Sequence, residues 1–181
     1  MTSPNQLPSL SGVEKLAPSH IVKKFKSTEH SLNDWLKRHA LQNQIADSAQ
    51  TYVVHRAGVV VAYYAMLYGD VALEECPSPV REGMPPHYRV PILKIARLAV
   101  DQQESGRGLG SALMKDAFTR ILGAAEIGGL RAVVVDALHE EAKRYYQKKF
   151  AFDESPLNPL LLFLRIEDLR LASGISVQRP E

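Results

Sequence analysis

Three glycines alternate with other residues in the segment 105–111, which is Ser-Gly-Arg-Gly-Leu-Gly-Ser. Because glycine lacks a β-carbon, such a loop can turn tightly and let a ligand approach its backbone closely. A helical pattern follows directly, and the start of a helix presents unpaired N–H groups and a positive dipole end to an anion. Arg107 can add a charge-assisted hydrogen bond to a phosphate. The segment predicts a phosphate-binding loop, with a flexible strand-to-helix turn as the alternative.

The spacing of the glycines restricts the kind of phosphate ligand. A dinucleotide site requires Gly-x-Gly-x-x-Gly near the first strand of a repeated βαβ array. This loop has Gly-x-Gly-x-Gly instead, and a Gly-Lys-Ser/Thr sequence of the Walker type does not occur in the chain. A cradle for the diphosphate of a coenzyme A-like ligand therefore remains.

The elements that must position this loop follow from the hydrophobic pattern. A helix with one apolar face is expected at 31–44, with Ser31 as its N-cap and Asp34 at the capping-box spacing. Two β-branched and aromatic runs, 51–57 and 59–68, meet at Ala57-Gly58 as a hairpin, and the five prolines of 76–91 predict a long loop. Strands are then expected at 93–100, 131–138 and 160–166, and helices at 109–122 and 140–150.

This order of elements predicts an α/β protein with a mixed central sheet flanked by helices. The N-terminal half of the sheet is expected to be antiparallel, and a parallel βαβ core follows it. Residues 1–17 are expected to form a flexible leader, 18–172 a single domain and 173–181 a C-terminal tail. No membrane span is expected, and the first residues lack the pattern of a signal peptide, which predicts a cytoplasmic protein.

Composition excludes several other classes of site. Cys76 is the only cysteine, so an intrachain disulfide is impossible and a cysteine zinc cluster is implausible; we expect no metal site. The net charge of +2 does not by itself indicate nucleic acid. RNA binding would require the 22 lysines and arginines to gather on one face.

The segment RLAVDQQESGRGLGSALMKDA, residues 97–117, resembles motif A of the GNAT N-acetyltransferases. That motif usually contains Gln/Arg-x-x-Gly-x-Gly/Ala; Gly108 and Gly110 match it, and Ser105 stands at the Gln/Arg position. With LNDWL, EEAKRYY and SPLNPL, the chain more specifically resembles the GNAT toxins of bacterial toxin–antitoxin modules over most of 18–170. Members of that subgroup acetylate the α-amino group of aminoacyl-tRNA, pair with a ribbon-helix-helix antitoxin and tend to dimerise. DNA would then be contacted only through the antitoxin.

The resemblance also implies roles for individual residues. The backbone of Leu98, Ala99 and Val100 would bind the pantetheine arm of acetyl-CoA. The diphosphate would be held by the loop and the start of the helix, that is, by Ser105, Gly106, Arg107, Gly108, Leu109, Gly110 and Ser111. Tyr146, in preference to Tyr145, would protonate the departing thiolate. The family usually has Tyr-x-x-x-Gly-Phe, whereas Tyr146 is followed by a stretch one residue longer with Ala151 in place of glycine.

Two further considerations concern the acceptor. An α-amino group titrates near 7.7–8.0 and lysine near 10.4, so at neutral pH the α-amine offers roughly a few hundred times more of the reactive neutral form. A site without a dedicated base would therefore favour aminoacyl esters over lysines. A tRNA would also need phosphate contacts, for which the candidates are Lys37, Arg38, Arg89, Lys143 and Arg144. A housekeeping acetyltransferase of protein N-termini or small amines, and an inactive CoA-binding regulatory subunit, are the alternatives.

Overall fold

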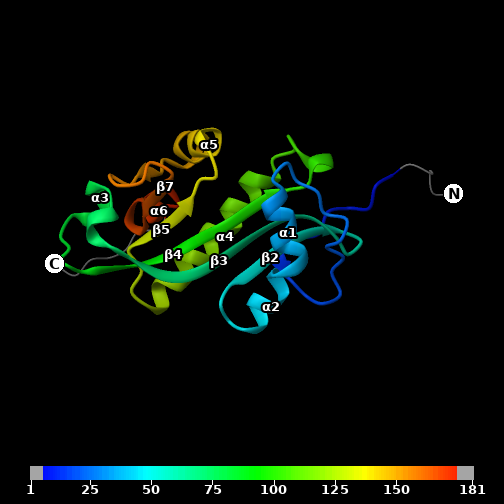
Figure 1. The fold of residues 1–181 in the computed structure, drawn as a ribbon, viewed down its shortest axis with the longest axis horizontal. Helices are drawn as coiled ribbons and strands as arrows, with labels where there is room; N and C mark the ends of the chain where they lie inside the picture. The colour runs from blue at the N-terminus through cyan, green and yellow to red at the C-terminus, as the bar shows by residue number, and fades with distance from the viewer. Residues whose placement is uncertain (1–5, 175–181) are drawn as a thin grey trace. The chain divides into compact units, whose positions relative to one another are not determined.

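The computed structural model describes residues 6–174; the remaining parts of the expected leader and tail, 1–5 and 175–181, lie outside the described residues. Seven strands form one mixed sheet in the order β1-β2-β3-β4-β5-β7-β6. The described chain consists of two compact units, which we call unit 1 (6–66 and 97–117) and unit 2 (67–96 and 118–174). Strands β3 (Val59–Ala72) and β4 (Arg89–Val100) and helix α4 (Leu109–Ile127) each contribute residues to both units (Figure 1). No helix in this part of the chain is long and apolar enough to cross a membrane.

The antiparallel part of the sheet belongs to unit 1. Strand β2 (Gln50–Arg56) pairs with β3, and Arg56 lies opposite Val59, so the hairpin closes through the two residues Ala57 and Gly58. Both of these residues have positive φ, 48° and 83°, which is the geometry that two-residue hairpin turns favour. The predicted hairpin is therefore confirmed at the predicted turn.

Part of the segment expected to be a flexible leader also pairs with this hairpin. Glu14–Lys15 form β1, which is antiparallel to β2, and the neighbouring Leu16 is buried. An isolated antiparallel bridge joins Leu10 to Arg56. The sheet thus begins within the expected leader, because backbone pairing and one buried leucine fix residues that composition alone would leave free. The domain limits at 17/18 and 172/173 stay predictions.

Two short helices cover β2 and β3 of unit 1 (Figure 1). The structure has α1 (His30–Arg38) and α2 (Ala40–Ile45) where the pattern predicted one helix over 31–44. The prediction of Ser31 as the N-cap is wrong: Glu29 is at the cap position and makes no side-chain cap bond. The buried Asn33 instead accepts hydrogen bonds of 2.8 Å from the Ser27 N–H and hydroxyl, which holds the chain at the start of α1.

Unit 2 contains the parallel pairing. Strand β5 (Ala132–Asp136) is parallel to β4, and β7 (Leu161–Arg165) is antiparallel to β5, which confirms the mixed sheet and its βαβ core. Strand β6 (Asp153–Glu154) pairs with the outer side of β7. The other elements of unit 2 are η1 (Leu73–Glu75), α3 (Ser78–Arg81), α5 (Glu140–Phe150) and α6 (Ile166–Ala172). The pattern predicted neither β6 nor α6.

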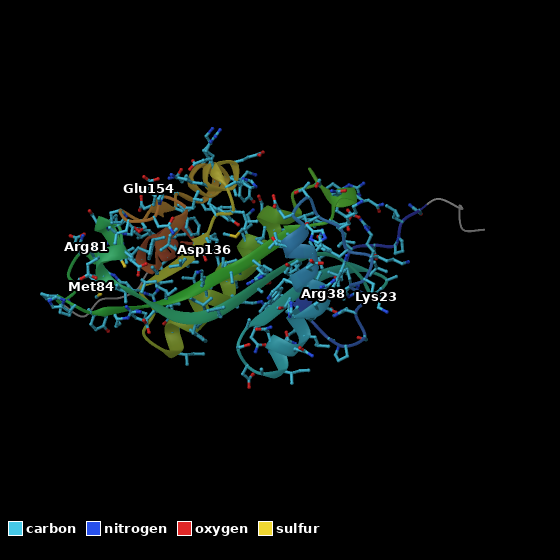
Figure 2. The ribbon with its side chains drawn as sticks, in the orientation of Figure 1. Lys23, Arg38, Arg81, Met84, Asp136 and Glu154 are labelled. Atoms are coloured by element: carbon cyan, nitrogen blue, oxygen red, sulfur yellow. The ribbon has the colours of Figure 1, made fainter. Side chains whose placement is uncertain are left out.

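The loop predicted at 76–91 contains the short helix α3, which packs on the sheet of unit 2. Cys76 and Val80 are buried against Ile92, Val134 and Phe163. Figure 2 shows the labelled Arg81 and Met84 in this segment, and Met84 is a partly buried neighbour of the same core. Burial raises the pKa of the Cys76 thiol to about 11, so the thiol stays protonated at neutral pH. Cys76 is therefore a core residue rather than a nucleophile.

Helix α5 ends at a strained residue, which gives a stability prediction. Ala151 has φ 57° and ψ 37°, the left-handed conformation that glycine usually occupies at this position. We expect Ala151→Gly to stabilise the fold by about 0.5–1 kcal/mol, because relief of strain of about 1–2 kcal/mol exceeds the gain in unfolded-state freedom. Urea unfolding measures the change. Ala142→Gly in the first turn of the same helix is the control and should destabilise the protein; a loss of stability in both variants contradicts the prediction.

Candidate active site

Two glycines give the loop between β4 and α4 its shape. Gly106 and Gly108 have φ values of 75° and 80°, which L-residues rarely adopt. A β-carbon added at either glycine would have no atom within 4 Å, so the space on that side of the backbone is open. Residues 105–108 are all exposed. The loop thus leaves its main chain accessible to a ligand, as a backbone cradle requires.

The start of α4 supplies the donors for that cradle. The Ala112 N–H donates to the carbonyl of Gly108 at 3.1 Å, and this hydrogen bond closes the first turn of the 19-residue helix α4. The N–H groups of Leu109 and Gly110 come before this turn and have no backbone carbonyl partner among the described residues. Unpaired donors and the positive end of the helix dipole both favour a phosphate group. The residues present therefore fit a diphosphate.

The last residues of β4 lie beyond its pairing with β5. The parallel pairing runs up to Ile95 opposite Val135, and β4 continues to Val100. Ala99 is buried in the core of unit 1, whereas Leu98 and Val100 are half-buried. Beyond its last pair with β5, the strand keeps main-chain groups on that side for a ligand. The role of these residues in binding stays a prediction.

An ion-pair network lies beside the glycine loop. The Glu104 carboxylate is 4% exposed and accepts hydrogen bonds from Arg56, at 2.7 Å from Nε and 3.2 Å from Nη2. Arg107, the residue expected to bind phosphate, also donates to Glu104, at 3.1 Å. The hydrogen bond from Arg56 lowers the pKa of Glu104, which therefore stays ionised at neutral pH. The sequence gave no sign of this network, since Arg56 and Glu104 lie 48 positions apart.

The two candidate tyrosines lie in unit 2, on α5, and differ in their surroundings. Tyr146 is buried, with its ring packed edge-on against Phe152 and Tyr145 at centroid distances of 5.8 and 5.4 Å. Burial raises the pKa of Tyr146, so the phenol keeps its proton. Its hydroxyl has no hydrogen bond to any residue within 6–174. The Tyr145 ring packs against Phe150, and the Lys149 ammonium lies 5.9 Å from the Tyr145 ring centroid.

The five basic candidates for tRNA contact fall into two groups. Lys37 and Arg38 are exposed in the last turn of α1, and Arg144 is exposed on α5; none of them has a side-chain partner in the described part of the chain. Arg89 donates to Asp70 at 2.6 Å, and Lys143 pairs with Glu154, which raises the pKa of Lys143. Figure 2 labels Arg38 and Glu154. Three of the candidates are therefore available to phosphate, and two are paired with acids.

A cluster of Glu14, His20 and His55 in unit 1 has the composition of a metal site. The Nε2 atoms of His20 and His55 lie 2.8 and 3.1 Å from the same Glu14 oxygen. Each Nδ1 accepts a backbone N–H, from Ala17 for His20 and from Gly58 for His55. The neutral rings therefore carry their protons on Nε2 and donate them to Glu14, an arrangement that opposes metal ligation through Nε2. The hydrogen bond from His20 is the main cause of the lowered pKa of Glu14.

Comparison with known proteins identifies the family of the chain. The family model of the acetyltransferase (GNAT) family matches residues 16–152. A tRNA-acetylating toxin of Mycobacterium tuberculosis strain H37Rv is 42% identical over 164 residues, which cover 91% of this chain and 97% of the relative.

Solved structures show the same fold. The structure of AtaT complexed with acetyl-methionyl-tRNAfMet has a TM-score of 0.83 and 23% identity, and the match covers 91% of this chain and 99% of that one. A mutant AtaT toxin bound to acetyl-CoA and to the C-terminus of the antitoxin AtaR has a TM-score of 0.77 and 22% identity, covering 92% and 99% of the two chains. With the family model spanning most of its length, this chain belongs to the GNAT family of acetyltransferases.

Proposed function

We propose that this protein is a toxin that transfers the acetyl group of acetyl-CoA to the α-amino group of an amino acid esterified to tRNA, which blocks translation. The observation that carries the proposal is the 42% identity with a tRNA-acetylating toxin along almost the whole of both chains. A likeness of that extent concerns more than the shared acetyltransferase fold, because it includes the segments outside the cofactor loop.

The residues that would hold acetyl-CoA come from one unit. The backbone of Leu98, Ala99 and Val100 would bind the pantetheine arm, and residues 105–111 would hold the diphosphate. The continuation of β4 past its last pair with β5 supports the first assignment. The two positive-φ glycines and the N–H groups of Leu109 and Gly110 at the start of α4 support the second.

For acetyl transfer the protein must hold the amine beside the thioester, polarise the thioester carbonyl and protonate the departing sulfur. Acetyl-CoA supplies an activated acetyl thioester, which a neutral amine can attack directly. A backbone N–H near Val100 would polarise the thioester carbonyl. Tyr146 would donate a proton to the sulfur, since its raised pKa keeps the phenol protonated. The Tyr146 hydroxyl makes no hydrogen bond within residues 6–174 and is not among the buried unsatisfied atoms, so it can reach a ligand, which supports its choice over Tyr145.

Phosphate contacts to the tRNA would come first from the basic residues that have no acidic partner. Lys37 and Arg38 form the last turn of α1, and Arg144 is exposed on α5. Arg89 and Lys143 would reach phosphate only by exchanging Asp70 and Glu154 for it. Of the two neighbours on α5, Arg144 is therefore the stronger candidate for a phosphate contact and Lys143 the weaker.

The assembly would follow the toxin–antitoxin pattern. We infer that a ribbon-helix-helix antitoxin binds the protein in the cytoplasm, that DNA is contacted only through that antitoxin, and that the toxin is a homodimer. The structure of AtaT with part of its antitoxin supports the first point, as a property of that relative. Sedimentation of the purified chain with and without an antitoxin encoded beside it measures both stoichiometries.

The proposal is tested by the choice of acceptor. Labelled acetyl-CoA is offered with charged tRNA, deacylated tRNA and a lysine peptide at equal concentration and neutral pH. We expect label only on charged tRNA, released by mild base as an N-acetylated amino acid. Label on the peptide or on a small amine, with none on charged tRNA, would instead indicate the housekeeping alternative. Binding of acetyl-CoA without transfer to any acceptor would indicate an inactive regulatory subunit.

A further inference from the structure

The loop departs from its family pattern at Ser105, where glutamine or arginine is usual, and an acidic residue precedes it directly. A carboxylate beside a diphosphate site would repel the ligand if it carried its charge alone. The negative charge of Glu104 is compensated by Arg56. Arg56 binds both carboxylate oxygens with two N–H groups, the fork arrangement that arginine and carboxylate favour.

The two arginines of the network differ in exposure and in how many of their N–H groups already have a partner. The Arg56 side chain is 15% exposed and uses Nε and Nη2 for Glu104 and Nη1 for the carbonyl of Pro8. The Arg107 side chain is 52% exposed and uses only Nη1, for Glu104. Its Nε and Nη2 have no partner within the described residues, 6–174.

The network of Arg56, Glu104 and Arg107 has a net charge of +1 beside the glycine loop. Arg56 and Glu104 cancel within the buried pair, so the charge of Arg107 remains uncompensated at the loop. Arg107 lies between Gly106 and Gly108, whose open backbone faces no other atom on the β-carbon side. Its tether to a buried carboxylate limits the rotamers of a side chain that would otherwise lose much entropy on binding.

We propose that Glu104 is a positioning residue, held by Arg56, that fixes Arg107 at the loop so that Arg107 replaces the missing glutamine or arginine as a side-chain ligand of the diphosphate. The inference rests on the proposed use of acetyl-CoA. It assigns Glu104 no contact with the ligand. Arg107 keeps its contact with Glu104 through Nη1, and its free N–H groups bind phosphate oxygen.

The test is a double-mutant cycle on acetyl-CoA affinity, measured by calorimetry on the full chain without any acceptor. We expect Arg107→Gln to weaken binding about 10-fold and Glu104→Gln about 5-fold, the losses expected for charge-assisted contacts at a half-exposed site. The double variant should bind about as weakly as Arg107→Gln alone, since Glu104 acts through Arg107. Additive losses, or unchanged affinity in Glu104→Gln, overturn the inference.

Stability is controlled separately, because removal of one partner from a buried ion pair destabilises a protein whatever its function. Asp168→Asn removes the carboxylate of a pair in unit 2 with the same two-bond geometry but a more exposed acid, and should leave acetyl-CoA affinity unchanged: Arg165 donates to Asp168 at 2.8 and 3.0 Å, and the Asp168 side chain is 39% exposed. If Glu104→Gln does not fold, Glu104→Asp gives the same comparison, because it keeps the charge and shortens the reach. A folded Glu104→Asp with wild-type affinity also overturns the inference. A folded wild-type chain that does not bind acetyl-CoA refutes the proposed function itself.

Discussion

We expect Tyr146→Phe to lower the turnover number of acetyl transfer by a factor of about 100 to 1,000, the range that loss of a general acid produces. Tyr145→Phe should change it by less than a factor of about 3. The Tyr146 hydroxyl has no hydrogen bond within the described chain, and its raised pKa keeps it protonated, as a proton donor must be. The KM for acetyl-CoA should stay within about twofold in both variants, because neither hydroxyl is needed to bind the cofactor.

The stability of the variants separates a catalytic role from a structural one. Phenylalanine keeps the edge-on packing of the Tyr146 ring against Phe152 and Tyr145, so the melting temperature should hardly change. Single-turnover kinetics with charged tRNA measures the chemical step directly. If Tyr145→Phe gives the larger loss of rate, the donor is Tyr145, and the assignment of Tyr146 is wrong.

The second large effect is expected at the glycine loop. Gly106→Ala should weaken acetyl-CoA binding about 30-fold, because alanine opposes a φ of 75° and places a methyl group on the open side of the cradle. The cost has two origins, strain in the backbone and lost access to the main-chain N–H groups. Calorimetric titration with acetyl-CoA measures the affinity, and urea unfolding measures the strain.

Gly83 provides a matched control for this substitution. It lies in unit 2 and has the same φ of 75°, also with no atom within 4 Å of an added β-carbon. Gly83→Ala should therefore destabilise the fold as much as Gly106→Ala, by about 1–2 kcal/mol, and leave the affinity unchanged. Equal affinities for the two variants would show that the loop does not contact the cofactor.

The elements that could be predicted from the sequence are those with a strong local pattern. The hairpin was predictable because Ala57-Gly58 separates two β-branched runs, and α5 because its bounds, Glu140–Phe150, coincide with an amphipathic segment. Strands β1 and β6 have two residues each, and no periodicity can be recognised over so short a length. The break between α1 and α2 is at His39, where φ is −122°, and the apolar pattern of 31–44 continues across it without a signal.

The same distinction applies to the candidate site. The glycine loop was predictable since the need for positive φ at Gly106 and Gly108 is a property of the residue type. The partners of charged side chains were not, because pairing depends on distant segments. The sequence around Lys143 predicted an exposed basic side chain, but the Lys143 side chain is 12% exposed and paired with Glu154. Arg107 was expected to bind phosphate, and its hydrogen bond to Glu104 was not predicted.

The pairing of residues 10–16 along β2 has a consequence for the solubility of the protein. Ser11 and Leu16 donate backbone hydrogen bonds to the carbonyls of His55 and Thr51. This short segment therefore covers β2, which would otherwise be the exposed edge strand of the sheet. Without this segment, the N–H and C=O groups of β2 that point away from β3 would lack partners, and such an edge is the kind of template on which a second molecule adds a strand. Trimming the chain to begin at Pro18 would create that template, and the shortened protein would tend to self-associate through it.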